Sequence, residues 1–320
     1  MPDNPKLSVV VPMYNEEEVI GDTVQRIKES LEVVPDWELI LVNDGSTDRT
    51  IEAANRAMSG KENVRLVSYA INRGRGKALR EGFRTAVGEI IVTIECDLSY
   101  NPSHILVLYR ELANNPEVDM ILGSAYMEGG RAKGVPAYRL AISKYGNKLL
   151  SYSFGAKLKT LTSMLRGYRR RVIDSLELES DGKEIHLEIL SKAIALNYLI
   201  REVPATLEGR KSGKSKFKFV STASSHLFLS FAERPMLVFG LIGILLLLGG
   251  IVGGIYLIVL WQQGNLTPSR PLIILVALLI LTGIQTLFFG FLSIQQGQLR
   301  REIFRLESQI KKNQIESLKR

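Results

Sequence analysis

Apolar and polar stretches alternate regularly through the first two thirds of the chain. Short runs of consecutive apolar residues are followed by longer stretches in which apolar positions recur every three or four residues. Short apolar runs are typical of buried strands, and the wider spacing is typical of helices. Strands separated by helices predict an α/β fold whose parallel sheet is covered on both faces. The predicted strands are 7–11, 38–42, 64–68, 90–94 and 120–122, and the predicted helices are 16–31, 47–58, 76–86 and 103–112.

The last third of the chain carries two long apolar segments. Residues 236–260 form a run of 25 without a charged side chain, and residues 272–294 supply 23 more. A helix of roughly 20 apolar residues spans the hydrocarbon core of a bilayer. We therefore predict two transmembrane helices that form a hairpin around the link 261–270. The alternative is a pair of helices buried in a protein core, which the presence of two such segments disfavours.

Charge at the ends of this hairpin predicts its orientation. Lys and Arg recur in the segments before the first span and after the second, whereas the link holds a single arginine, Arg270. The positive-inside rule then predicts a multi-pass protein of the cell membrane, with residues 1–215 and both termini in the cytoplasm. The apolar run near the N-terminus ends at Pro12, so we expect no signal peptide.

Three further segments have an amphipathic pattern. Residues 138–154 and 216–235 mix aromatic and aliphatic side chains with polar and cationic ones, so we expect both at the membrane surface. Packing of either segment against the domain core is the alternative. The predicted cytoplasmic helical tail, 295–320, places apolar residues at four-three-four spacing, which indicates homo-oligomerisation through the tail and spans. An amphipathic helix on the membrane is the competing interpretation of that tail.

Composition excludes several classes of protein. The chain has 41 basic and 33 acidic residues and a formal net charge of +8. Cys96 is the single cysteine, which excludes an intramolecular disulfide, and three histidines with one cysteine exclude a zinc finger. Nucleic-acid binding is a poor explanation of the positive charge, because the clustered cations lie beside apolar interfacial segments.

Polar residues follow each predicted strand of the α/β region. Parallel sheets bind ligands at the carboxyl ends of their strands, so these residues are the candidate site. Asp44, at one strand end, could accept hydrogen bonds from a base or a ribose; the alternative is a tight turn with Ser46 or Thr47 capping the next helix. Gly76 and Lys77 stand where a helix begins, and glycines and a helix N-terminus favour a bound phosphate.

Two carboxylates, Glu95 and Asp97, follow the predicted strand 90–94. Their spacing of two allows both to hold one hard divalent cation, Mg²⁺ or Mn²⁺, through oxygen ligands. Such a cation would bridge a diphosphate and neutralise a leaving nucleotide. A solvated acidic loop is the alternative, and the fully apolar strand before the pair makes it less attractive.

Four segments together resemble glycosyltransferase family 2, whose fold is the Rossmann-like GT-A fold. They are residues 8–16 (SVVVPMYNE), 42–48 (VNDGSTD), 72–77 (NRGRGK) and 95–99 (ECDLS). The chain is most similar to polyprenyl-phosphate glycosyltransferases, namely dolichol-phosphate mannose synthases and bacterial undecaprenyl-phosphate glycosyltransferases. The resemblance covers residues 6–235, and the hairpin suits members with two spans. It implies a GT-A catalytic domain over 1–215, a nucleotide-sugar donor, a divalent cation, a polyprenyl-phosphate acceptor and inversion at the anomeric carbon.

The resemblance also implies roles for individual residues. The implied nucleotide-binding residues are Pro12, Tyr14, Glu16, Asp44, Gly76 and Lys77, and the implied metal-binding residues are Glu95, Asp97 and Ser99. Arg139 and Ser143 match an acceptor-phosphate pair, and their spacing of four places both on one helical face. Residues 210–216 match the family's basic loop, which implies Lys216 as a further contact of the same phosphate; a juxtamembrane basic patch attracted to anionic lipid is the alternative, and both can hold. The implied catalytic residues are Asp97, Arg139, Ser143 and Arg210.

The chain departs from the family pattern at three positions. Glu95 replaces the usual aspartate, Ala125 replaces a phosphate-binding arginine, and Thr160 replaces an acidic residue. A lipid monophosphate is mostly dianionic at pH 7, so the reaction needs no general base. We expect transfer of one sugar, from a donor of the UDP-glucose or GDP-mannose type. The alternatives are a processive polysaccharide synthase, disfavoured because its QxxRW motif is missing, and a non-catalytic nucleotide-sugar-binding membrane scaffold.

Overall fold

The computed structural model describes residues 6–60, 62–209, 235–265, 267 and 271–318. The chain divides into two compact units, one of residues 1–223 with 304–320 and one of residues 224–303. Residues 216–234 of the predicted interfacial segment 216–235 lie outside the described residues, as do the predicted site residues Arg210 and Lys216.

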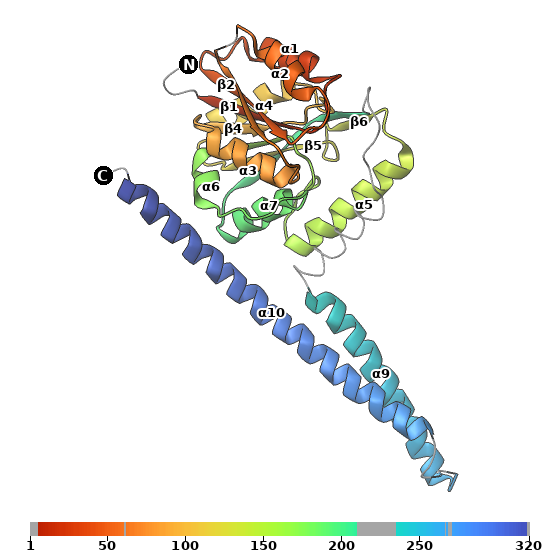
Figure 1. Ribbon diagram of the computed structural model, residues 1–320. Helices are drawn as coiled ribbons and strands as arrows, with labels where there is room; N and C mark the ends of the chain where they lie inside the picture. Colours follow the sequence, from red (N-terminus) through yellow and green to blue (C-terminus); the bar gives the residue numbers. More distant parts are fainter. Residues whose placement is uncertain (1–5, 61, 210–234, 266, 268–270, 319–320) are drawn as a thin grey trace. The chain divides into compact units, whose positions relative to one another are not determined.

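A mixed seven-stranded sheet forms the centre of the first unit (Figure 1). The strand order is β3-β2-β1-β4-β7-β5-β8. The five predicted strands are confirmed, each within a few residues of its predicted bounds. The strands are β1 (Leu7–Met13), β2 (Trp37–Asp44), β3 (Val64–Tyr69), β4 (Ile90–Thr93), β5 (Met120–Ser124), β7 (Arg166–Arg169) and β8 (Ile200–Pro204).

Helices cover both faces of this sheet. Helices α1 and α4 pack with α2 on one face, where the side chains of Leu7, Val9 and Val11 join a single apolar core. Helix α3 packs on the other face, against β1 and β2. The predicted helix 16–31 begins later, at Ile20, because the preceding residues form a loop at the sheet edge. The helices are α1 (Ile20–Leu31), α2 (Thr50–Met58), α3 (Arg75–Thr85), α4 (Ser103–Asn114), α5 (Ala137–Phe154), α6 (Arg170–Ser175) and α7 (Ile185–Ala195).

The five predicted strands run parallel, but the sheet also contains an antiparallel strand that was not predicted. β7 lies between β4 and β5 and is antiparallel to both. Its sequence, RGYR, has no apolar run, and the buried guanidinium of Arg166 is accommodated by backbone carbonyl acceptors of Ser163, His186 and Leu161. Hydrogen bonding therefore replaces apolar character as the reason this strand can be buried.

A small second sheet pairs β6 (Arg131–Lys133) with β9 (Thr206–Glu208) in parallel. It is tied to the loop after β4, because the Glu208 amide donates to the Ser99 carbonyl over 2.8 Å. His104 holds the other end of β9 by accepting the Thr206 amide at Nε2 over 3.1 Å. The small sheet thus lies beside the carboxyl ends of the main strands.

The C-terminal region contains two long apolar helices, α9 (Pro235–Gln262) and α10 (Pro271–Leu318). Both are long and apolar enough to cross a membrane, with a mean hydropathy of 2.6 in their most apolar windows. Their large apolar side chains are mostly exposed, which suits helices in contact with lipid. A Cβ at Gly243 would lie 3.1 Å from the Gly283 carbonyl oxygen, so glycine allows close backbone approach within the hairpin.

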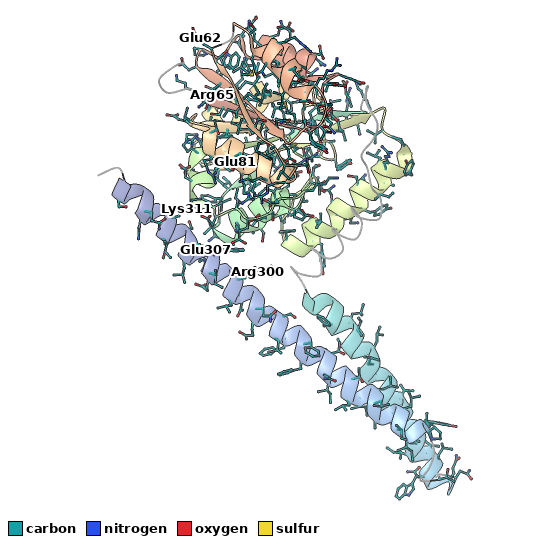
Figure 2. All side chains as sticks on the ribbon, viewed as in Figure 1. Glu62, Arg65, Glu81, Arg300, Glu307 and Lys311 are labelled. Carbon is teal, nitrogen blue, oxygen red and sulfur yellow. The ribbon has the colours of Figure 1, made fainter. Side chains whose placement is uncertain are left out.

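Helix α10 joins the predicted second span and the predicted tail without a break near residue 294. Its C-terminal part is charged, as the side chains of Arg300, Glu307 and Lys311 show in Figure 2. The apolar and the charged halves of this helix suit different solvents. A boundary between membrane and water would therefore fall within one continuous helix.

Candidate active site

The carboxyl ends of β1, β2 and β4 open onto a cavity of about 840 Å³. Its wall also includes the loops around residues 134–136 and 207–209, next to the small sheet. Ligand cavities at this edge of an α/β sheet are typical of the fold class. The predicted site residues that line the cavity are Pro12, Tyr14, Glu16, Asp44, Glu95, Asp97, Ser99 and Arg139.

A tight turn after β4 brings Glu95 and Asp97 to the cavity wall. The Leu98 amide donates to the Glu95 carbonyl over 3.2 Å, and Leu98 has a left-handed φ of 49°. Cys96 and Leu98 are part of the apolar core, while Glu95 and Asp97, together with Cys96, line the cavity. The hydroxyl of Ser99 donates to Asp97 Oδ1 over 2.6 Å. Ser99 therefore orients the carboxylate that the sequence predicts as a metal ligand.

The Glu95 carboxylate is chemically unusual. Its Oε2 atom is buried and has no hydrogen-bond partner among the described residues. Burial, opposed by the charge of Arg75 and reinforced by that of Asp97, raises the pKa of Glu95 to about 7. A buried carboxylate oxygen without a donor is costly unless a cation or a proton occupies it. This atom therefore meets the requirement for a metal ligand.

The charge of the cavity wall also favours a bound cation. Five acidic side chains line the cavity, against three basic ones, which are Arg75, Arg139 and Lys183. A diphosphate adds further negative charge, so its binding needs a compensating cation. Two carboxylates supply fewer oxygens than Mg²⁺ or Mn²⁺ takes, and the remaining ligands would come from phosphate oxygens and water. The donor set therefore fits a divalent cation that is completed by its substrate.

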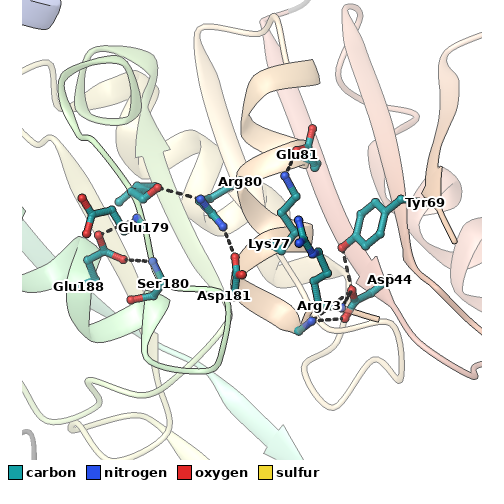
Figure 3. A network of polar contacts seen from close by, with 12 residues as sticks. Asp44, Tyr69, Arg73, Lys77, Arg80, Glu81, Glu179, Ser180, Asp181 and Glu188 are labelled. Carbon is teal, nitrogen blue, oxygen red and sulfur yellow. Dashed lines mark hydrogen bonds and ion pairs between the residues drawn. The ribbon is translucent and has the colours of Figure 1, made fainter. Parts of the chain in front are cut away.

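Asp44 is held within a network at the end of β2 (Figure 3). Its carboxylate accepts hydrogen bonds from the Tyr69 hydroxyl (2.8 Å), the Asn72 side chain (3.0 Å) and the backbone amides of Arg73 and Gly74 (2.9 Å each). A carboxylate offers about four lone-pair sites, and these donors use them. Asp44 thus orders the 72–74 loop at the cavity wall. Its contact with a base or ribose stays a prediction.

The loops after β1 and β2 are locked together. The Asn15 amide donates to Ser46 Oγ over 3.0 Å, and the Thr47 amide donates to Asn15 Oδ1 over 2.8 Å. Ser46 and Thr47 therefore hold the neighbouring loop rather than cap α2. Asp48 instead accepts the Thr50 amide at the start of that helix, over 3.0 Å.

The N-terminus of α3 does not have the open phosphate site that the sequence predicts. The amides of Gly76 and Lys77 donate to the Asp181 carbonyl over 2.7 and 3.3 Å, so a protein oxygen occupies the expected phosphate position. Neither residue lines the cavity. A Cβ at Gly76 would come within 2.2 Å of the Ser180 carbonyl, so this glycine permits the close approach of the loop 178–184. Lys77 pairs with Glu81 on its own helix (Figure 3). Gly76 and Lys77 thus support a loop, and their phosphate contact stays a prediction.

That loop, residues 178–184, is fixed by three charged side chains. Glu188 on α7 accepts the amides of Glu179 and Ser180 over 2.9 Å each, and Arg80 binds Asp181 (Figure 3). Lys192 completes the cluster at 2.9 Å from Glu188. Burial would raise the pKa of Glu188, but the hydrogen bonds from Lys192 and the loop amides outweigh it and hold the pKa below its usual range. Glu188 therefore has a structural role.

Helix α5 carries the predicted acceptor-phosphate pair. Arg139 lines the cavity, with its Nε 3.1 Å from the Tyr138 hydroxyl. Ser143 is one turn further along and does not line the cavity. Asn147 Nδ2 lies 2.8 Å from the Ser143 carbonyl and 3.4 Å from its hydroxyl. The structure thus brings Arg139, without Ser143, to the other site residues, and the role of the pair stays a prediction.

Two departures from the family pattern lie away from the cavity. Ala125 and Thr160 are buried and do not line it. The Thr160 hydroxyl lies 2.7 Å from Ser124 Oγ, and the Thr160 amide donates to Glu202 over 2.7 Å. In this chain the two positions are part of the packing beneath the site.

Several cavity residues were not predicted. Asn72 and Arg75 belong to the NRGRGK segment, whose three cations were the available signal. Lys183 comes from the loop 178–184 and Glu208 from β9, and their positions depend on tertiary contacts with α3 and with the loop after β4. Local sequence carries no signal for such residues.

Comparisons with known proteins show the family of this chain. A family model described as glycosyl transferase family 2 matches residues 8–176. A dolichol-phosphate mannosyltransferase of Pyrococcus furiosus is 32% identical over 216 residues, covering 67% of this chain and 59% of that protein. The chain thus spans less than two thirds of that relative. A dodecaprenyl-phosphate galacturonate synthase of Rhizobium johnstonii is 30% identical over 305 residues, covering 90% of this chain and 86% of that protein.

Solved structures show the same fold. The glucosyl-3-phosphoglycerate synthase of Mycobacterium tuberculosis, in complex with Mn²⁺, uridine diphosphate and phosphoglyceric acid, superposes with a TM-score of 0.56 at 20% identity. The match covers 72% of this chain and 78% of that one. A second complex of that enzyme holds Mg²⁺ and uridine diphosphate. The predicted GT-A fold is confirmed.

Proposed function

Because this chain belongs to glycosyltransferase family 2, we propose that it moves a single sugar from a nucleotide-sugar donor to a polyprenyl phosphate, with inversion at the anomeric carbon. One observation carries the proposal. The cavity brings Glu95, Asp97 and Arg139 together at the sheet edge of a chain that also holds two candidate membrane spans. The names of the Pyrococcus and Rhizobium relatives, both of which describe polyprenyl-phosphate sugar transfer, support the same acceptor class.

The donor would lie between the locked β1 and β2 loops and the turn after β4. Pro12, Tyr14 and Glu16 line the cavity at the first of these loops, where a base and ribose would bind. The loop ordered by Asp44 forms the adjoining wall. Holding the donor on these fixed loops positions its anomeric carbon for attack, which lowers the entropic part of the barrier.

Glu95 and Asp97 would hold Mg²⁺ or Mn²⁺, with Ser99 orienting Asp97. When bound, the cation would neutralise charge on the donor diphosphate as the leaving group departs. The two carboxylates fit this role, as does the Glu95 oxygen, which has no hydrogen-bond partner in the part of the chain that the structure describes. The Mn²⁺ and Mg²⁺ in the Mycobacterium structures support a cation in this fold.

The acceptor needs little help beyond orientation. A lipid monophosphate is largely dianionic at pH 7, so its oxygen attacks without a base. Arg139, at the start of α5, would hold this phosphate beside the donor through charge-assisted hydrogen bonds. The new bond forms from phosphate oxygen to the anomeric carbon while the bond to the leaving diphosphate breaks on the opposite face. Arg210, Lys216 and Ser143 remain proposed partners of the same phosphates.

The membrane arrangement follows from the substrates. Residues 236–260 and 272–294 would anchor the enzyme in the cell membrane, with the catalytic domain and both termini in the cytoplasm, where nucleotide sugars are available. Helix α10 presents Leu299, Ile303 and Leu306 as exposed apolar residues beyond the predicted span. We propose homo-oligomerisation through this region and the spans.

The test is a transfer assay with the purified full chain, polyprenyl phosphate and a panel of labelled UDP and GDP sugars. The proposal predicts a labelled lipid with at least one donor, and its loss in the Asp97→Asn variant. A matched variant, Glu52→Gln on the exposed surface of α2, should keep full activity. Donor binding without transfer to lipid, across the panel, would instead support a non-catalytic nucleotide-sugar-binding scaffold.

A further inference from the structure

Two cationic side chains from different parts of the chain line the cavity. Arg75 begins α3, and Lys183 lies in the loop 178–184. Within the described ranges, neither side chain makes a hydrogen bond or an ion pair. Most other charged residues near this end of the cavity are paired, for example Lys77 with Glu81 and Arg80 with Asp181. Two cations that line a cavity without ion-pair partners can bind an anion.

The two cations are close enough to affect each other. Partial burial of the ammonium group, followed by the charge of Arg75, lowers the pKa of Lys183, and Glu184 opposes this effect. Arg75 also acts on Glu95, whose pKa it lowers against the effect of burial. Arg75 is therefore coupled electrostatically both to the candidate metal ligand and to Lys183, and all three line the cavity. Neighbouring like charges are unfavourable without a ligand, and an anion between them removes the repulsion.

The position of Lys183 is fixed by contacts outside the cavity. The Asp181 carbonyl accepts the amides of Gly76 and Lys77, Arg80 binds the Asp181 carboxylate, and Glu188 accepts the two preceding amides. Lys183 is two residues beyond this held segment. The loop is thus pre-organised, so Lys183 can bind a ligand without first losing backbone entropy.

We propose that Arg75 and Lys183 form an oxyanion site that binds an anionic group of the sugar donor, beside the metal site. The proposal rests on the nucleotide-sugar donor of the proposed function. The anion has two sources within such a donor: the diphosphate itself, or an acidic substituent such as a carboxylate on the transferred sugar. Arg75 offers a planar fork and Lys183 a point charge, and both suit phosphate or carboxylate oxygens.

The test measures equilibrium binding by titration calorimetry, with the purified full chain, Mn²⁺ and no lipid. The ligands are UDP, UMP, UDP-glucose and UDP-glucuronate, with the guanosine nucleotides and their sugars in parallel. The variants are Arg75→Gln, Lys183→Gln, the double variant, and Lys183→Arg, with Lys157→Gln as an exposed control outside the cavity. Thermal melting checks that each variant is folded.

If the diphosphate is the ligand, each single glutamine variant loses about ten- to a hundredfold in affinity for the nucleoside diphosphate and little for the monophosphate. If a sugar carboxylate is the ligand, the loss is confined to the glucuronate donor. Lys183→Arg keeps most of the affinity, and Lys157→Gln keeps all of it.

Wild-type affinity for every ligand in the folded double variant would overturn the inference. An equal loss for the monophosphate and the diphosphate would do the same, because it would place the cations near the nucleoside. A different result would overturn the proposed function: the donor binds, but no sugar is transferred to the lipid. The two failures are therefore distinguishable.

Discussion

Glu95 provides the most demanding prediction, because its buried carboxylate is both a candidate metal ligand and a proton acceptor near neutral pH. Its pKa is raised to about 7, first by burial. A protonated carboxyl cannot bind the cation, so protons and metal compete for this residue. We expect metal affinity of the donor-loaded enzyme to fall as pH is lowered through 7.

The size of the effect follows from the pKa. At pH 8 about one Glu95 in eleven is protonated, and at pH 6 about ten in eleven are protonated, so affinity falls roughly tenfold, or about 1.4 kcal/mol. The free energy of unfolding of the metal-free protein changes with pH in the opposite direction to the metal affinity. Because the pKa of the folded state lies above the ordinary value of 4.5, the free energy of unfolding decreases as pH rises from about 4.5 to about 7.

The assay is Mn²⁺ titration of the purified enzyme with saturating nucleotide sugar and no acceptor lipid, at pH 6 and pH 8. The donor phosphates are both esterified, so they lack the second ionisation near pH 6 that a free nucleotide would add. Glu95→Gln should bind weakly and equally at both pH values, and the surface variant Glu52→Gln should keep the tenfold ratio. Equal wild-type affinity at pH 6 and pH 8 would refute the reasoning.

Four further predictions use other parts of the molecule. Asp97→Asn should abolish most metal-dependent turnover, measured as labelled lipid formed, whereas unchanged turnover would remove Asp97 from the metal site. Arg139→Ala should lose a contact of roughly 1.5–3 kcal/mol and slow transfer about ten- to a hundredfold, with donor affinity unchanged and partial rescue by lysine; full activity at limiting acceptor in detergent would contradict this role. Glu188→Gln should lower the free energy of unfolding by about 1–3 kcal/mol, because two loop amides and a lysine lose their charged partner. A membrane-impermeant thiol probe outside intact cells should label a cysteine introduced at Asn265 and not one at Ser308, and the reverse pattern would overturn the orientation.

The strands and helices before residue 125 were predictable because their apolar spacing follows directly from burial. Continuous apolar runs such as Val9–Val11 can only be strands covered on both faces in this context. β7 could not be predicted in this way. Its burial depends on Arg166, whose guanidinium donates to carbonyls contributed by two other segments. Hydrogen bonding of that kind has no periodicity in sequence.

The residues of the candidate site were likewise predictable only where local sequence determines their position. Glu95, Asp97 and Tyr14 are at strand ends, and parallel strand ends meet at one edge, so position in sequence was sufficient. Gly76 could not be placed correctly, because its amide binds a loop more than a hundred residues away. Lys183 reaches the cavity on that same loop. Long-range contacts determine the positions of both residues, and local sequence patterns carry no information about those contacts.

One measurement tests the central claim most directly. The purified enzyme is incubated with polyprenyl phosphate, a divalent cation and its α-linked nucleotide sugar, and the released nucleoside diphosphate is compared with the lipid-linked sugar, whose anomeric configuration is determined by NMR. The account predicts equal amounts of the two products, a β-linked sugar phosphate, and loss of both products in excess EDTA. An α-linked product, diphosphate release without lipid, or full turnover in EDTA would contradict it.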